Sequence, residues 1–93
     1  MTMSRIAKHI IFAGRVQGVG FRFTALSIAN RYELTGQVRN LPNKTVEMIA
    51  QGHPDDIADC IRDISESLGA YIRETKIEEI PIDPRYEDFK ITF

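Results

Sequence analysis

The sequence is poor in the residues that build disulfides and metal sites. Its 93 residues include one cysteine, two histidines and no tryptophan. The lone cysteine, Cys60, cannot form an internal disulfide. With only His9 and His53 beside it, the chain has no cluster of residues at the spacing of a metal site. We therefore expect a protein that uses neither a metal nor a cofactor.

The sequence also lacks an excess of charge of one sign and any long apolar run. A formal net charge of −1 argues against long-range attraction to nucleic acid or to an anionic membrane. The first apolar run, residues 10–13, is too short for the core of a signal peptide behind the start at residues 1–5. We therefore expect a cytoplasmic protein whose partner is a small molecule, with any anion site formed by a local group of residues.

The composition that is present suits one small domain covering residues 1–93. The chain is 43% hydrophobic and 27% charged, as in ordinary globular proteins. A chain of this size buries only about 60 to 65% of its unfolded surface, so most apolar positions must meet in a single core. We expect a monomer with little room for a deep pocket.

Hydrophobic periodicity, interrupted by glycine and proline, predicts strands and two helices. The strands are predicted at residues 6–13, 37–40, 45–51, 71–82 and 89–93. Helical spacing predicts one helix at residues 21–32, followed by a turn at Gly36, and a second helix from Pro54 to Gly69. The order β-α-β-β-α-β plus a C-terminal strand predicts an α+β, ferredoxin-like (split β-α-β) fold, with a mostly antiparallel sheet and two helices on one face.

The most informative segment joins the first strand to the first helix. It consists of Gly14, Arg15, Val16, Gln17, Gly18, Val19, Gly20, Phe21 and Arg22. Glycines let successive N–H groups converge on one point, and the helix start adds further donors. This predicts a nest for a phosphate-sized anion. The segment is neither a Walker A loop nor a dinucleotide fingerprint, and by spacing alone it also fits a tight corner with Arg22 in solvent.

The two predicted helix starts carry opposite charges. The second has Asp55 and Asp56, as the helix dipole prefers, whereas the first has no acid and places Arg22 at its positive end. In isolation that arrangement costs about 0.3 to 1 kcal/mol. A bound dianion would reverse the sign, because the guanidinium can then donate a bidentate pair of hydrogen bonds. We therefore predict that Arg22 binds a phosphoryl group.

Asn40 is the second candidate site residue. A right-handed crossover through the first helix makes the first two strands parallel, so they end at the same edge of the sheet. Alternation places Asn40 on the face of Val38, near the start of that helix. A carboxamide can hold a water in line with a bound phosphorus, although Asn40 also fits a residue that caps the turn before Leu41.

The chemistry is restricted by what this edge of the sheet lacks. The sequence places no obvious histidine, cysteine or carboxylate there for nucleophilic or acid–base catalysis. An alcohol leaving group would need a proton. A carboxylate leaving group resembles a Glu side chain, with a pKa of about 4.3, and departs unprotonated. An acyl phosphate therefore suits this site.

The segment from Gly14 to Arg22 resembles the signature of the acylphosphatase family, Gly-Arg-Val-Gln-Gly-Val-Gly-Phe-Arg, which is intact here. A second family block is similar to residues 36–40, with Gln37 where an aromatic is usual. The resemblance implies an acylphosphatase, which hydrolyses carboxyl-phosphate anhydrides to a carboxylate and inorganic phosphate without a metal. It implies phosphate binding by the loop and Arg22, water orientation by Asn40, and inhibition by the product phosphate.

The sequence departs from the family pattern at a second place besides Gln37, and two alternative functions stay open. Asn43-Lys44 replaces the family's usual Asp-Gly turn, which we expect to affect the hairpin or its stability. One alternative is a non-catalytic phosphate- or carbamoyl-phosphate-binding module, as in the similar N-terminal domain of hydrogenase-maturation carbamoyltransferases. The other is an RNA-recognition domain, which the lack of paired aromatics in a strand motif disfavours.

The remaining chemically notable residues are expected to be structural. Cys60 lies on the apolar stripe of the second helix and is predicted to be buried, and His53 is predicted to lie at the start of that helix. His9 is predicted on a face of the sheet. The core or the walls of the site are predicted to contain Phe12, Phe21, Phe23, Phe89 and Phe93, with Phe23 off the helix stripe and partly exposed.

Overall fold

Residues 4–93 form five strands and two helices in the order that the sequence predicts. They are β1 (Ile6–Gly14), α1 (Phe21–Arg31), β2 (Thr35–Asn40), β3 (Val46–Gly52), α2 (Pro54–Leu68), β4 (Ile72–Ile80) and β5 (Phe89–Ile91). This computed structural model describes residues 4–93, so residues 1–3, part of the start considered above for a signal peptide, lie outside the described residues.

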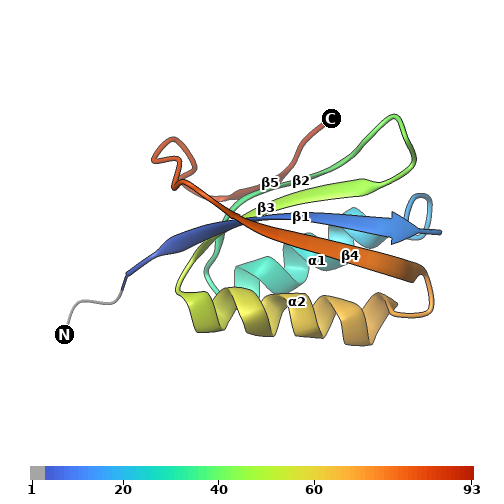
Figure 1. Ribbon diagram of the computed structural model, residues 1–93, viewed down its shortest axis with the longest axis horizontal. Helices are drawn as coiled ribbons and strands as arrows, with labels where there is room; N and C mark the ends of the chain where they lie inside the picture. Colours follow the sequence, from blue (N-terminus) through green and yellow to red (C-terminus); the bar gives the residue numbers. More distant parts are fainter. Residues whose placement is uncertain (1–3) are drawn as a thin grey trace.

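The strands form one sheet in the order β4-β1-β3-β2-β5. The β1–β3, β1–β4 and β2–β3 pairs are antiparallel, and only β2–β5 is parallel. Both helices cover one face of the sheet (Figure 1). The predicted α+β, ferredoxin-like fold with a mostly antiparallel sheet is therefore confirmed. Since β1 and β2 both run antiparallel to β3, they end at the same edge, as the crossover rule requires.

The core lies between the helices and the covered face of the sheet. Its largest fully buried members are Ile10, Phe12, Phe21, Met48, Ile57 and Ile64. The rings of Phe12 and Phe21 pack with centroids 4.9 Å apart, joining β1 to the start of α1. Cys60 is fully buried, as predicted, and this burial raises the pKa of its thiol to about 12. Within residues 4–93, neither helix has the length and apolar composition needed to cross a membrane.

The prediction that Gly36 forms the turn out of α1 is wrong. The chain turns earlier, at residues 32–34, with Glu33 in the left-handed region at φ +56°. Gly36 instead lies inside β2, opposite Ala50, with φ +139°. A Cβ at this position would come 1.8 Å from the carbonyl oxygen of Ile49. Glycine is needed here because the backbone of β3 approaches closely, not because the chain turns.

Strand ends also differ from the predicted ones by one or two residues. The largest differences are of two residues: β2 starts at Thr35, before the predicted residue 37, β4 ends at Ile80, before residue 82, and β5 ends at Ile91, before residue 93. The segment between β4 and β5 is held by Gln51, which is only 1% exposed. Its Oε1 accepts from the Asp83 N–H at 2.6 Å, and its Nε2 donates to the Asp83 carbonyl at 3.0 Å. A buried side chain of β3 thus fixes a polar loop that sequence periodicity does not describe.

Candidate active site

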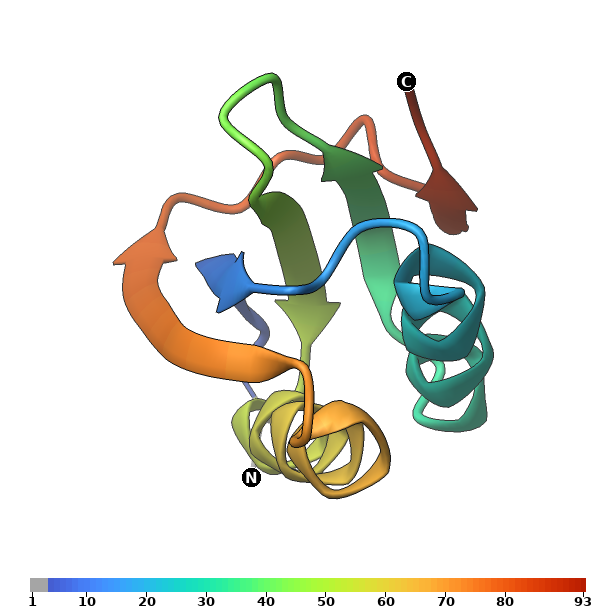
Figure 2. The ribbon, with the colours of Figure 1, turned by 90° about the vertical axis from the view of Figure 1, so that its right-hand side faces the viewer.

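The β1–α1 loop, residues 15–20, crosses the end of the sheet to reach the first turn of α1 (Figure 2). Three contacts hold it in place. The Arg15 N–H donates to the Tyr71 carbonyl at 2.8 Å, Val16 is fully buried in the core, and the Gln17 side chain contacts the β2–β3 turn. The loop is therefore fixed at its beginning, while Gly18 and Gly20 remain exposed.

The exposed part of the loop presents unused backbone donors. Gly18 and Gly20 adopt left-handed conformations, with φ +80° and +76°, and a Cβ at either would meet no atom within 4 Å. Glycine is thus required by the backbone angles, and the space beside it is open. The first hydrogen bond of α1 joins the Thr24 N–H to the Gly20 carbonyl at 3.1 Å. Within residues 4–93, the N–H groups of residues 16–20 have no hydrogen-bond partner, so they are available to an anion.

Arg22 and Asn40 meet at a small pocket beside this loop. The pocket has a volume of about 120 Å³ and is lined by Val16, Gly18, Gly20, Phe21, Arg22, Phe23 and Asn40. Pockets that enclose drug-sized ligands measure about 300 to 1,000 Å³, so this smaller pocket suits a group of phosphoryl size. The predicted proximity of Asn40 to the start of α1 is confirmed.

Arg22 lies where the helix dipole does not favour a cation. The first turn of α1 contains no acidic residue, whereas that of α2 contains Asp55 and Asp56. Among the described residues Arg22 has no carboxylate partner. Its guanidinium is consequently available for an external anion.

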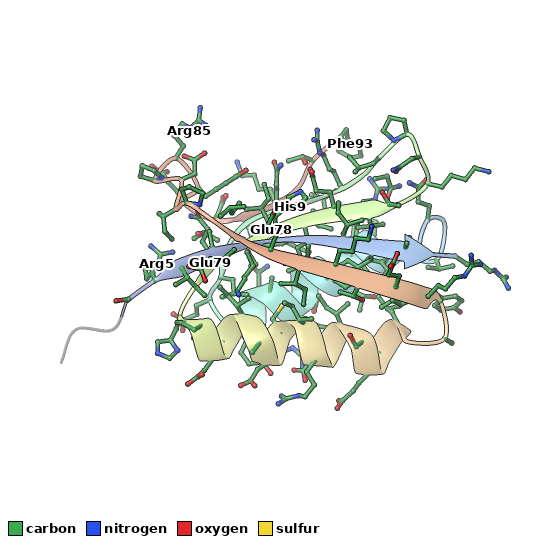
Figure 3. All side chains as sticks on the ribbon, in the orientation of Figure 1. Arg5, His9, Glu78, Glu79, Arg85 and Phe93 are labelled. Carbon is green, nitrogen blue, oxygen red and sulfur yellow. The ribbon has the colours of Figure 1, made fainter. Side chains whose placement is uncertain are left out.

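The ring of Phe93 lies against the Arg22 guanidinium, with its centroid 5.3 Å from Cζ. Phe93, labelled in Figure 3, is 96% exposed, which excludes the core from the two predicted places, the core and the walls of the site. It instead lies beside the pocket in a cation–π arrangement. Spacing could not reveal this contact, because Phe93 lies beyond the end of β5. Phe23 is 70% exposed at the pocket, in agreement with its position off the helix stripe.

Asn40 carries an unsatisfied acceptor. Its Oδ1 atom is buried and has no hydrogen-bond partner in the part of the chain that the structure describes. Buried acceptors are nearly always paired, and leaving one unpaired costs about 1 to 3 kcal/mol. The following turn is capped by Asn43, whose Oδ1 accepts from the Thr45 N–H and hydroxyl at 3.2 and 2.6 Å. A turn-capping role for Asn40 is thus unsupported, and its oxygen remains available to a donor such as water.

Four residues of the predicted phosphate-binding segment lie outside the pocket lining. Gly14 belongs to the end of β1, and Val19 packs against the core. Arg15 lies beside Tyr71 with its side chain exposed. Gln17 points to the β2–β3 turn, where its Nε2 donates to two carbonyls. The segment thus divides into residues that line the pocket and residues that anchor the loop, a division that sequence alone does not reveal.

The titratable residues considered above lie elsewhere. His53 caps α2, its Nδ1 accepting from the Asp55 N–H at 3.2 Å. His9 lies on the sheet face away from the helices (Figure 3), with its Nε2 2.9 Å from the Glu47 carboxylate. Among residues 4–93, no three His, Cys, Asp or Glu side chains gather in a way that could hold a metal ion. The pocket offers one cation, backbone donors and a carboxamide, without a group that titrates near neutral pH.

Comparisons with known proteins agree with these features. Residues 8–91 match the family model described as Acylphosphatase. The acylphosphatase of Chlorobaculum tepidum is 40% identical over 92 residues, which cover 98% of each chain. The crystal structure of acylphosphatase from Bacillus subtilis superimposes with a TM-score of 0.87 at 27% identity, covering 95% of this chain and 99% of that one. Full-length HypF, solved in a phosphate- and nucleotide-bound form, gives 0.88 at 32% identity, covering 100% of this chain but 12% of that one. With a family match over almost its whole length, this chain belongs to the acylphosphatase family of hydrolases.

Proposed function

We propose that this protein hydrolyses acyl phosphates to a carboxylate and inorganic phosphate in the pocket between the β1–α1 loop and the end of β2. The observation that carries the proposal is the meeting of three complementary groups. Unused loop amides, the available guanidinium of Arg22 and the unpartnered oxygen of Asn40 all border one pocket of phosphoryl size.

The loop and Arg22 bind the phosphoryl oxygens. The N–H groups of residues 16–20 and of the first turn of α1 donate to them, and the positive end of the helix dipole adds to the attraction. Arg22 donates a charge-assisted pair of hydrogen bonds. In phosphoryl transfer, the transition state spreads charge over the three equatorial oxygens, so donors fixed before the reaction stabilise it without reorganising.

Asn40 holds the attacking water. Its buried Oδ1 accepts a hydrogen bond from the water and places the water oxygen opposite the leaving group. The water oxygen forms a bond to phosphorus while the bond from phosphorus to the acyl oxygen breaks, and the proton lost by the water passes to the phosphate product or to solvent. The acyl group leaves as a carboxylate, which needs no proton because its pKa is about 4. No side chain of the pocket has to act as an acid or a base.

Benzoyl phosphate hydrolysis by the purified protein tests the proposal. We expect turnover without added metal, an unchanged rate in the presence of EDTA, and competitive inhibition by inorganic phosphate, which occupies the same donors. A rate that EDTA abolishes and a divalent metal restores would contradict the metal-independent mechanism.

The likeness to a small part of HypF favours a second candidate, a module that binds a phosphate or carbamoyl phosphate without hydrolysing it. Both candidates use the same donors of the loop and Arg22, so phosphate binding alone does not separate them. Binding of inorganic phosphate by calorimetry together with no hydrolysis of benzoyl phosphate or carbamoyl phosphate would support the module and contradict the enzyme.

A further inference from the structure

Gln17 connects the two halves of the pocket. Its side-chain Nε2 donates to the carbonyl of Leu41 and to the carbonyl of Thr45, both at 2.9 Å. Both acceptors lie in the turn between β2 and β3, and this turn lies beside the loop at the end of the sheet (Figure 2). Because both partners can only accept, the amide nitrogen must be the atom that faces them. Gln17 therefore makes two directed hydrogen bonds between segments that are remote in sequence.

The hairpin turn does not need these bonds in order to close. The Leu41 N–H donates to the Thr45 carbonyl at 2.9 Å, and the Lys44 N–H donates to the Leu41 carbonyl at 3.1 Å. Each carbonyl already accepts one backbone hydrogen bond, and Gln17 uses its remaining lone pair. The side chain thus joins the loop to a hairpin whose own backbone hydrogen bonds already close it.

Two of the residues that these hydrogen bonds join are next in sequence to residues that line the pocket. Gln17 directly precedes Gly18 of the pocket lining, and Leu41 directly follows Asn40. A movement of the hairpin relative to the loop would change the distance between the Asn40 carboxamide and the loop amides. The two hydrogen bonds of Gln17 oppose such a movement. Gln17 is the residue before Gly18, and its acceptor Leu41 is the residue after Asn40.

We propose that Gln17 is a positioning residue that sets the separation between the phosphate-binding loop and Asn40, and so the alignment of the attacking water with phosphorus. The inference rests on the function proposed above. A displacement of about 1 Å in a reacting geometry can cost about 100-fold in rate. Loss of the Gln17 bonds should therefore lower kcat, while the loop and Arg22 continue to bind phosphate.

The first experiment separates positioning from binding. Gln17→Met keeps the length of the side chain but removes both donors, and Gln17→Glu places acceptors against the two carbonyls. We expect each variant to lower kcat about 10- to 100-fold on benzoyl phosphate. The inhibition constant of inorganic phosphate should change less than about threefold, because phosphate itself does not need Asn40. Gln17→Lys, whose ammonium can donate to both carbonyls, should recover part of kcat relative to Gln17→Met.

A double-mutant cycle with Asn40→Ala tests whether Gln17 acts through Asn40. If it does, the double variant should have a kcat less than about threefold below that of Asn40→Ala alone. The effects of Gln17→Met and Asn40→Ala on kcat will then not multiply. Gln37→Met is the matched control, since Gln37 lies on β2 and makes no side-chain hydrogen bond within residues 4–93. It should keep the wild-type kcat.

Three results would overturn the inference while leaving the proposed function intact. They are an unchanged kcat in Gln17→Met, effects of Gln17→Met and Asn40→Ala that multiply, and a phosphate inhibition constant that rises in step with the fall in kcat. The last would mean that Gln17 shapes the phosphate loop itself. If the wild-type protein does not hydrolyse benzoyl phosphate, or if Asn40→Ala keeps full turnover, the proposed function fails first, and the inference fails with it.

Discussion

Arg22, in the first turn of α1, and Asn40, at the end of β2, line the same pocket. The sheet explains why they meet. β1 and β2 are both antiparallel to β3, so β1 delivers the loop that leads to Arg22 at the same edge where β2 ends with Asn40. The two side chains face one small space with different chemistry, a fixed cation and a neutral carboxamide, so their removal should have different kinetic consequences.

Arg22→Ala and Asn40→Ala should each lower kcat/KM for benzoyl phosphate by about 10²- to 10³-fold, the usual cost of removing one preorganised stabilising group. Arg22→Ala should also raise the inhibition constant of inorganic phosphate, because in the proposed mechanism the guanidinium binds the phosphoryl oxygens in the ground state as well. Asn40→Ala should leave that constant nearly unchanged. Steady-state kinetics with and without phosphate will measure both.

Two substitutions on the far part of α1 provide matched controls. Arg31 and Asn30 are exposed and lie outside the pocket. Arg31→Ala and Asn30→Ala remove the same functional groups from positions outside the pocket and should keep near-normal turnover. A folded Arg22→Ala or Asn40→Ala protein with comparable activity would show that the corresponding role is wrong.

The dependence of rate on pH should be shallow through neutrality. Among the residues that the structure describes, only Arg22 lines the pocket with an ionisable side chain, and neither a guanidinium nor a carboxamide changes charge between pH 6 and 8. We expect kcat for benzoyl phosphate to vary less than about threefold over that range, measured in buffers of constant ionic strength. A bell-shaped profile centred near pH 6.5 would instead assign a proton-transfer step to a histidine.

The site was predictable where backbone conformation and local charge leave a mark on the sequence. Gly18 and Gly20 mark left-handed positions, and the absence of an acid beside Arg22 marks a helix start whose cation has no carboxylate beside it in the first turn. The position of Asn40 follows from strand alternation and the handedness of the crossover. These features depend on local sequence or on general rules of topology, so they can be recognised without a structure.

Contacts between segments remote in sequence were not predictable. The sequence predicts a turn at Gly36 because glycine is common in turns, whereas glycine is needed there because the carbonyl of Ile49 on the neighbouring strand lies so close. The bonds of Gln17 to the hairpin depend on how far the loop leans over the sheet, and the stacking of Phe93 on Arg22 depends on the path beyond β5. Neither periodicity nor spacing contains this information.

Lys44→Gly should stabilise the protein. Lys44 occupies the β2–β3 turn at φ +70°, a conformation that costs a residue with a Cβ about 1 to 2 kcal/mol. Glycine removes that cost but loses more entropy on folding, which offsets about 0.4 to 1 kcal/mol of the gain. We expect a net increase of about 0.5 to 1 kcal/mol in the free energy of unfolding, measured by urea denaturation.

Lys76→Gly is the matched control for that substitution, because Lys76 is exposed in β4 and has no positive φ. There glycine should destabilise the strand. Equal effects of the two substitutions would mean that backbone strain at residue 44 does not limit stability, and that the departure from Asp-Gly is neutral.

Glu47 should contribute to stability at neutral pH but not in acid. Burial alone would raise the pKa of this carboxyl, but hydrogen bonds from His9 and from Arg39, whose Nε lies 2.6 Å from Oε1, outweigh it and lower the pKa. The unfolded chain then binds a proton at Glu47 more readily than the folded protein does. The stabilisation by Glu47 is complete at pH values above the pKa of about 4.3 in the unfolded chain. It is lost as the pH falls through the lower pKa of Glu47 in the folded protein.

Comparison with Glu47→Gln isolates this contribution from that of the other carboxyl groups. The difference in unfolding free energy between wild type and Glu47→Gln should be about 1 kcal/mol at pH 7. This value is small because Arg39 is partly exposed and solvent weakens its attraction to Glu47. The difference should shrink as the pH falls from 5 to 2.5. Glu66→Gln is the control, since Glu66 is exposed on α2 and has no ion pair among residues 4–93. A Glu47→Gln difference that stays constant with pH would mean that the His9–Glu47–Arg39 contacts do not favour the charged carboxylate. Urea denaturation of the three proteins at each pH decides between the two outcomes, because every other carboxyl group is common to wild type and Glu47→Gln and cancels in the difference.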